Sequence, residues 1–101
     1  MSIKRIEDIL GTPVEFSQNW EFSGVSSRTD AEKEDLAREA LENKCKQWVD
    51  DRIREGKNIA YDHAQLIRVD NEGSETHQDW RGVRTHKCWG TGVGYLFVNM
   101  P

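Results

Sequence analysis

The sequence predicts an α+β fold in which a short N-terminal helix and one long amphipathic helix pack on an antiparallel sheet of about four strands, in a roll-like arrangement. Apolar residues recur at steps of three and four through residues 36–53, which is the helical period. Residues 14–22 alternate, and 93–98 are nearly all apolar, as in strands. Because helical and strand segments are segregated, an antiparallel sheet is favoured. The chain has 101 residues and 11.7 kDa, which predicts a single domain spanning residues 1–101.

The first ten residues are predicted to form a short helix. Isoleucines and a leucine recur at helical spacing from Ile3 to Leu10. Gly11 suits the left-handed cap that follows a last helical turn, and Pro13 prevents the helix from continuing.

A strand and the long helix follow. Residues 14–22 alternate between apolar and polar, which predicts a strand with one buried face. Residues 17–19 could form a bend, a bulge or a hairpin turn that splits this run into two short strands. Thr29 and Glu32 have the spacing of a capping box, so we expect the helix to begin there and to end at Gly56. A helix of about 26 residues is roughly 39 Å long, so it must lie along a sheet.

The next strand is predicted over residues 59–69, ending in a polar turn at 70–73. Apolar residues fall at both odd and even positions of this segment, which predicts a strand that pairs on both edges.

Two further strands are predicted at the C-terminal end. Residues 83–89 and 93–98 flank Gly90-Thr91-Gly92, which has the composition of a tight hairpin turn, and Gly94 marks a bulge beside it. The run 95–98 is continuously apolar and is expected to be a central strand.

Composition excludes several classes of protein. The net charge of -4 argues against a general nucleic-acid binder, which would need a broad basic face. No run of about 18 apolar residues could span a membrane, and the charged N-terminus does not resemble a signal peptide. A cytoplasmic location is therefore expected. Cys45 and Cys88 fit that location as free thiols, although a disulfide or a shared metal remains open.

The strongest candidate contact surface is the segment 80–89, hereafter the contact segment. It combines cations, a histidine and two of the four tryptophans directly after an acidic stretch. Cations there could meet phosphates or carboxylates while the indoles stack, as at interface hot spots. The structural alternative is that Trp89 lies in the core and the arginines pair with nearby carboxylates. The candidate binding residues are Trp80, Arg81, Arg84, His86, Lys87 and Trp89.

Acidic residues on the long helix form a second candidate surface. They could mimic nucleic-acid phosphates toward a basic partner groove, or simply be an ordinary solvated helix face. The binding candidates among them are Glu34, Asp35, Glu42, Asp50 and Asp51.

No catalytic or metal site is predicted. His77, His86 and Cys88, with Cys45 or His63, contain zinc-ligand residue types, but no closely spaced pair exists to seed such a site. A nucleophilic Cys88 beside a histidine lacks any surrounding signature. We therefore predict a protein that is not an enzyme and uses no cofactor.

Two functions from different classes are consistent with these observations. The first is a small protein-binding module that inhibits or regulates a larger protein or ribonucleoprotein, for example a phage or mobile-element inhibitor of bacterial defence. The alternative is binding of RNA or single-stranded DNA through residues 80–89. No membrane partner is expected, and an exposed helix or free strand edge could also form a homodimer.

Overall fold

A computed structural model describes residues 2–10 and 14–101. It confirms the α+β class, with a long helix, a short helix and a four-stranded antiparallel sheet. Gly11 and Pro13, which were expected to end the first helix, lie outside the described residues. In chain order the elements are β1 (Ser2–Arg5), α1 (Ile6–Leu10), β2 (Phe16–Gly24), α2 (Asp30–Arg54), β3 (Ala60–Gln78) and β4 (Arg84–Met100).

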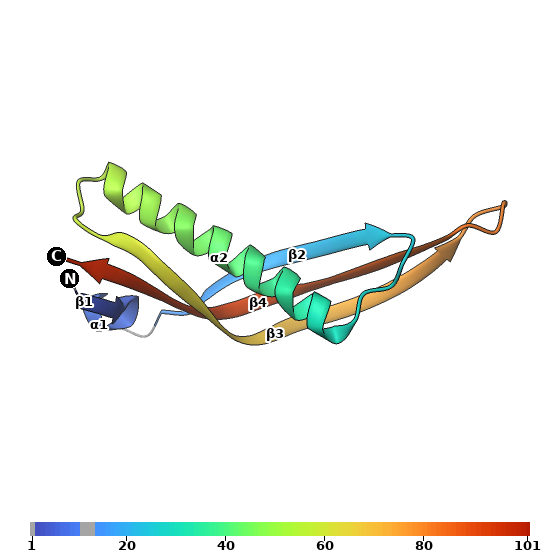
Figure 1. Cartoon of the computed structure of the whole chain (residues 1–101), viewed down its shortest axis with the longest axis horizontal. Coiled ribbons are helices and arrows are strands. Elements are labelled where there is room, and N and C mark those ends of the chain that lie inside the picture. Colours follow the sequence, from blue (N-terminus) through green and yellow to red (C-terminus); the bar gives the residue numbers. More distant parts are fainter. Residues whose placement is uncertain (1, 11–13) are drawn as a thin grey trace.

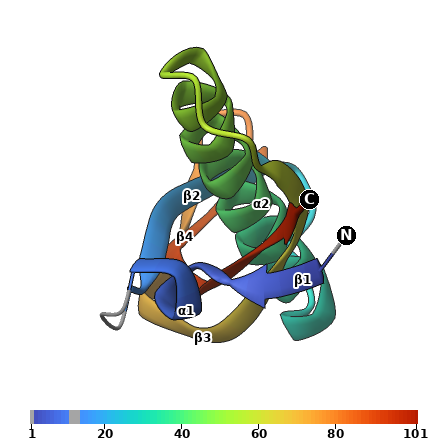
Figure 2. The same cartoon turned by 90° about the vertical axis from the view of Figure 1, so that its left-hand side faces the viewer.

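Strand β4 is the centre of the sheet. It pairs with β3 along one edge, and β1 and β2 share its other edge, all antiparallel. Figure 2 shows the sheet curving around α2, with β1 and α1 at the near end of the molecule. The run 95–98 therefore does belong to a central strand, as its apolar composition predicted.

The predicted hairpin turn at residues 90–92 is wrong, because β4 runs through these residues without a break. The glycines serve close packing instead. A Cβ atom at Gly92 would lie 2.6 Å from the carbonyl oxygen of Ala37 in α2, and one at Gly90 would lie 3.0 Å from the Trp20 indole. Glycine at 92 thus lets the helix backbone approach the sheet backbone.

The prediction of a helix over the first ten residues is wrong for residues 2–5. Ser2 to Arg5 form strand β1, and only Ile6 to Leu10 are helical. Ile3 pairs with Asn99, so the end of β4 gains a hydrogen-bonded neighbour that a helix could not supply. Ile6, with 1% of its surface exposed, anchors α1 in the core.

Strand β2 has no bend at residues 17–19, because its pairing with β4 continues in register from Phe16 to Gly24. Phe16 and Trp20 are buried, and Phe22 is half-buried on the same face. Gln18 shares that face but is exposed and pairs with Gly92. One polar residue in the apolar row is therefore accommodated within a continuous strand.

Strand β3 is longer than predicted and, among the described residues, pairs only along its edge with β4. The polar segment 70–73 is a bulge inside it, in which Asn71 has a φ of 54°. Two more register shifts leave Asp62 and Ile67 unpaired. Each inserted residue reverses which side chains face the helix. Apolar residues at odd and even positions therefore face the same side, and this gave the false impression of two buried faces.

The bulge at Ile67 lies opposite Gly94. A Cβ at Gly94 would lie 1.9 Å from the Gln65 carbonyl oxygen, so only glycine fits there. The predicted bulge beside Gly94 is thus present, with the extra residue in the neighbouring strand.

Helix α2 forms as its sequence predicts. The Thr29 hydroxyl accepts a hydrogen bond from the Glu32 amide, and the Glu32 carboxylate accepts one from the Thr29 amide, both at 3.2 Å. Gly56, with a φ of 91°, follows the C-cap residue Glu55. The buried face of the helix consists of Ala37, Leu41, Cys45 and Val49.

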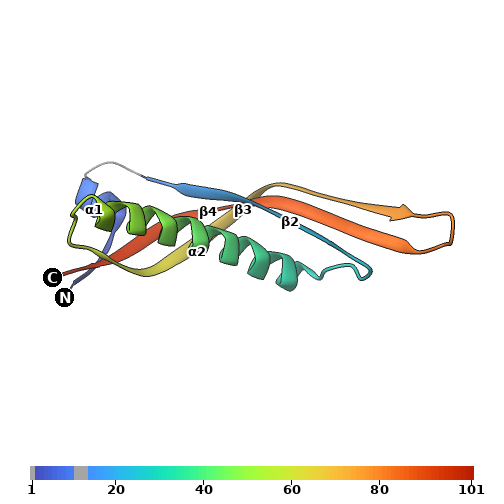
Figure 3. The same ribbon diagram turned by 90° about the horizontal axis from the view of Figure 1, so that it is seen from above.

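The molecule is elongated, with principal extents of 58 × 23 × 18 Å. Helix α2 lies along the long axis, and the hairpin of β3 and β4 continues past the N-terminal end of α2 and past β2 (Figures 1 and 3). Both chain termini lie at the opposite end. No helix in the described part of the chain is long and apolar enough to cross a membrane.

Candidate docking site at the hairpin tip

The projecting hairpin ends in a tight loop of residues 79–83, hereafter the tip loop. The last paired residues are Gln78 and Arg84. The Asp79 amide donates to the Val83 carbonyl, and the Gly82 amide donates to the Asp79 carbonyl, both at 3.0 Å. Gly82 has a φ of 84°, in the left-handed region that favours glycine.

The Asp79 carboxylate fixes the shape of this loop. Its Oδ1 accepts hydrogen bonds from the amides of Arg81 at 2.8 Å and Val83 at 3.0 Å, and its Oδ2 accepts from the Arg81 guanidinium at 3.1 Å. The amide of Val83, followed by the Arg81 side chain and amide, lowers the pKa of Asp79. The loop is therefore held by its own anion rather than by packing.

Trp80 lies at the end of this fixed loop with 92% of its surface exposed. The Arg81 guanidinium lies 5.7 Å from the centre of its ring, within cation–π range. An exposed indole is unfavourable in water, and tryptophan and arginine are the residues that most often dominate binding energy at protein interfaces. The tip loop thus presents an apolar and a cationic group together, away from the body of the protein.

The rest of the contact segment belongs to the stem of the hairpin and has internal partners. Trp89 is half-buried over Gly73, where a Cβ would lie 2.3 Å from its ring. Lys87 pairs with Glu21 at 3.2 Å. His86 shares a hydrogen bond of 3.1 Å with the Thr76 hydroxyl. Strand pairing places Trp89 several residues back from the tip, so the two indoles of the contact segment do not lie together.

Arg84 differs from the other cations of the segment. It is exposed at the first position of β4, and among residues 2–10 and 14–101 it has no ion-pair partner. The structure thus brings together Trp80, Arg81 and Arg84 near the tip, and separates them from His86, Lys87 and Trp89.

The open face of the sheet, opposite α2, is already covered by polar side chains. The Arg5 guanidinium lies 4.4 Å from the centre of the Tyr95 ring, and His63 stacks on Phe97 at 4.5 Å. Arg68 reaches across β4 to Glu15 at 3.0 Å. The Arg5 and His63 side chains thus each cover one face of an aromatic ring on this side of the sheet.

The acidic residues of α2 do not form a uniform anionic face. Glu34 and Asp35 both pair with Arg38, at 2.8 and 2.9 Å, and Asp51 lies 3.7 Å from Arg54. Asp50 is exposed, and Glu42 is half-buried. Because cations interleave with these carboxylates, the helix presents mixed charge to a partner.

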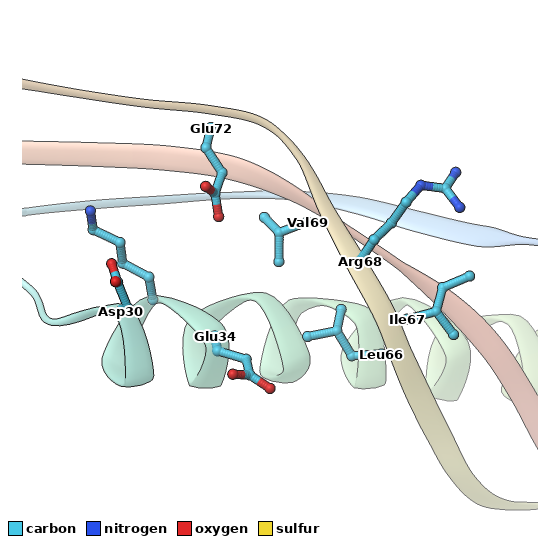
Figure 4. A pocket seen from close by; sticks show the side chains of 8 residues that line it. Asp30, Glu34, Leu66, Ile67, Arg68, Val69 and Glu72 are labelled. Carbon is cyan, nitrogen blue, oxygen red and sulfur yellow. The ribbon is translucent and has the colours of Figure 1, made fainter.

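Glu34 also borders a shallow groove of about 440 Å³ between the start of α2 and β3 (Figure 4). Its walls carry the carboxylates of Asp30, Glu34 and Glu72, whereas Leu66 points toward the helix and Arg68 points away from it. Among the described residues, no group of three or more histidine, cysteine or acidic side chains is arranged to hold a metal ion.

The histidines and cysteines considered for metal or nucleophilic chemistry are dispersed. Cys45 and Cys88 are both free and buried against the helix–sheet interface, and burial raises the pKa of Cys45 to about 12. His77 pairs with Glu75, and His63 pairs with Asp62. A buried, protonated thiol such as that of Cys45 is a poor nucleophile.

Sequence reasoning missed the role of Asp79. The signal was present, since Asp79-Trp80-Arg81-Gly82 has aspartate at the first and glycine at the fourth position, as many type I turns do. The turns were predicted instead at the polar segment 70–73 and at Gly90-Thr91-Gly92.

No protein family, curated protein or solved structure matches this chain.

Proposed function

We propose that this protein is a non-enzymatic protein-binding module that inserts the tip of its β3–β4 hairpin into a pocket of a larger protein or ribonucleoprotein and thereby regulates it. The observation that carries this proposal is the 92% exposure of Trp80 on a loop fixed by the Asp79 carboxylate. Because the loop is ordered before binding, little conformational entropy is lost when the indole docks.

The shape of the molecule supports insertion rather than flat contact. The hairpin extends past α2 and β2, so the indole can enter a concave site without a clash from the body (Figure 3). Arg84, which is exposed at the base of the tip loop and has no ion-pair partner in the described part of the chain, suits a pocket with an acidic rim. Inhibition of a bacterial defence complex by a phage or mobile element is one biological setting that fits such a module.

The experiment is a quantitative capture from native lysate with the wild type, Trp80→Ala and the control Val25→Ala. Val25 is also an exposed apolar residue, at 75%, but lies in the loop before α2. We expect Trp80→Ala to weaken binding by about thirtyfold or more, as for a hot-spot residue, and Val25→Ala to have no effect. Recovery of the same proteins by all three would refute docking through the tip.

The alternative function is binding of RNA or single-stranded DNA. Exposed Arg84 close to the tip indole favours it, because a base could stack on Trp80 while Arg84 meets a phosphate. The cations of Arg81 and Lys87 are already paired with Asp79 and Glu21, which counts against it. Fluorescence titration with single-stranded oligonucleotides at low and moderate salt decides between the two: quenching with a salt slope supports nucleic acid, and no quenching at low salt excludes it.

A further inference from the structure

An apolar groove lies at the end of the molecule opposite the tip loop, between α1 and the last turns of α2. Its volume is about 760 Å³, which is within the range of small-molecule sites. The groove, as the term is used below, is walled by apolar side chains from α1, α2, the segment before β3 and the end of β4. They are Ile6, Ile9, Leu10, Trp48, Ile59 and Met100, with Pro101 next to Met100.

The apolar residues that line the groove range from fully buried core residues to exposed residues at its rim. Ile6 is fully buried and forms part of the main core cluster, whereas Leu10 at the rim is 52% exposed. Trp48 and Ile59 pack against the core from one side and line the groove on the other. Such a concentration of apolar surface around a concavity is characteristic of a binding site.

One side of the groove carries polar groups with a cationic excess. They are Arg52 and Lys57, with Glu55 and Asn58. Arg52 donates from Nη2 to Glu55 at 2.8 Å and lies 5.0 Å from the centre of the Trp48 ring, while its Nε atom is buried without a hydrogen-bond partner. Lys57 is exposed and, within the described ranges, forms no ion pair. Because Arg52 is already paired with Glu55, a single anionic group beside the apolar walls would meet this pair and the unpaired charge of Lys57.

We propose that the groove binds an amphipathic carboxylate, an unbranched aliphatic chain that ends in one carboxylate group. The chain lies along the apolar walls, and the carboxylate accepts hydrogen bonds from Arg52 and Lys57. The protein as a whole carries a charge of -4 and repels anions, so any preference for a carboxylate must arise from these two side chains.

The test uses dodecanoate below its micelle-forming concentration, titrated into a Trp80→Phe background so that the exposed indole does not contribute to the fluorescence. Trp48 lines the groove and reports binding. Two probes with the same chain separate the effect of charge: dodecyltrimethylammonium, which is cationic, and dodecyl maltoside, which is uncharged. We expect dodecanoate to bind more tightly than either, and each methylene removed from it to weaken binding by up to about fourfold.

Charge variants locate the headgroup. Arg52→Gln should weaken dodecanoate binding about tenfold or more, as expected for loss of a hydrogen bond to a charged group, and leave dodecyl maltoside unchanged. Arg54→Gln is the matched control, because Arg54 is two residues away with 76% of its side chain exposed and does not line the groove. Lys57→Gln provides a second variant outside the helix if Arg52→Gln reduces the helical signal in circular dichroism.

Equal affinity for the three probes, no dependence on chain length, or no saturable binding would overturn the proposal. So would a loss of dodecanoate affinity in Arg54→Gln equal to that in Arg52→Gln. This test of the groove and the test of docking through the hairpin can fail separately, since the groove and the tip loop share no residue.

Discussion

At the scale of single residues, the shape of the tip depends on one carboxylate. Asp79 is exposed, yet it accepts hydrogen bonds from two backbone amides and a guanidinium within a loop of five residues. Its neighbour Trp80 makes no comparable contact with the body of the protein. The position of the exposed indole therefore depends on a neighbouring carboxylate that already has its hydrogen-bond partners within the loop.

This arrangement predicts a local dependence on pH. Because the pKa of Asp79 is lower in the folded loop than its ordinary value of 3.8, the carboxylate stabilises the loop above that value, and the stabilisation is lost as pH falls through the lowered pKa. We expect the amide resonances of Arg81 and Val83 to move toward random-coil positions in this acidic range. Asp79→Asn keeps an acceptor oxygen but cannot titrate, so its loop amides should not show this transition. A transition of equal size in both proteins would show that Asp79 does not fix the loop.

At the scale of elements, the long helix and the alternation of β2 were predictable because their signals are local. The Thr29–Glu32 capping box and the apolar stripe of α2 lie within one segment, and the structure has them as the sequence indicates. The continuity of β4 through Gly90–Gly92 was not predictable, because the need for glycine arises from α2 and β2, which are distant in sequence.

Strand β3 is a second element whose structure the sequence pattern alone did not predict. Its three bulges each reverse the alternation, so that a sequence pattern which assumes a period of two assigns its apolar residues to two faces. The bulges also have a benefit, because they interrupt the free edge of a long strand and so oppose edge-to-edge association. The composition of residues 80–89 was enough to select this segment as the candidate site. That Trp80 lies at the tip and Trp89 in the stem follows from strand pairing, which the composition does not reveal.

The close approach of α2 to β4 predicts a clear stability effect. In Gly92→Ala the new methyl group would lie 2.6 Å from the Ala37 carbonyl oxygen, so the helix must shift away from the sheet. We expect a loss of about 1–3 kcal/mol in the free energy of unfolding, measured by urea denaturation. Gly24→Ala is the control, because its methyl would meet the ring of the half-buried Phe22 side chain and no backbone atom of the helix. An equal loss in both variants would mean that helix packing is not the cause.

At the scale of the whole molecule, the residues that form the core and the exposed residues at the end of the hairpin lie in different parts of the structure. The core consists of two clusters under α2, one including Leu41, Val49 and Leu96 and the other including Trp20 and Cys88. Every residue from His77 to Thr85 is exposed. The outer hairpin therefore adds reach to the molecule but no residue to either cluster.

This division predicts that the outer hairpin can be removed without unfolding the protein. We would replace residues 77–85 with Asn-Gly, which closes a two-residue hairpin turn between the paired residues Thr76 and His86. Since only exposed residues are lost, the free energy of unfolding should change by no more than about 1 kcal/mol in urea denaturation. Partner capture should fall as far as it does in Trp80→Ala, while dodecanoate binding in the groove is retained. A shortened protein that unfolds would place the hairpin within the cooperative core, and one that still captures the partner would place the docking surface elsewhere.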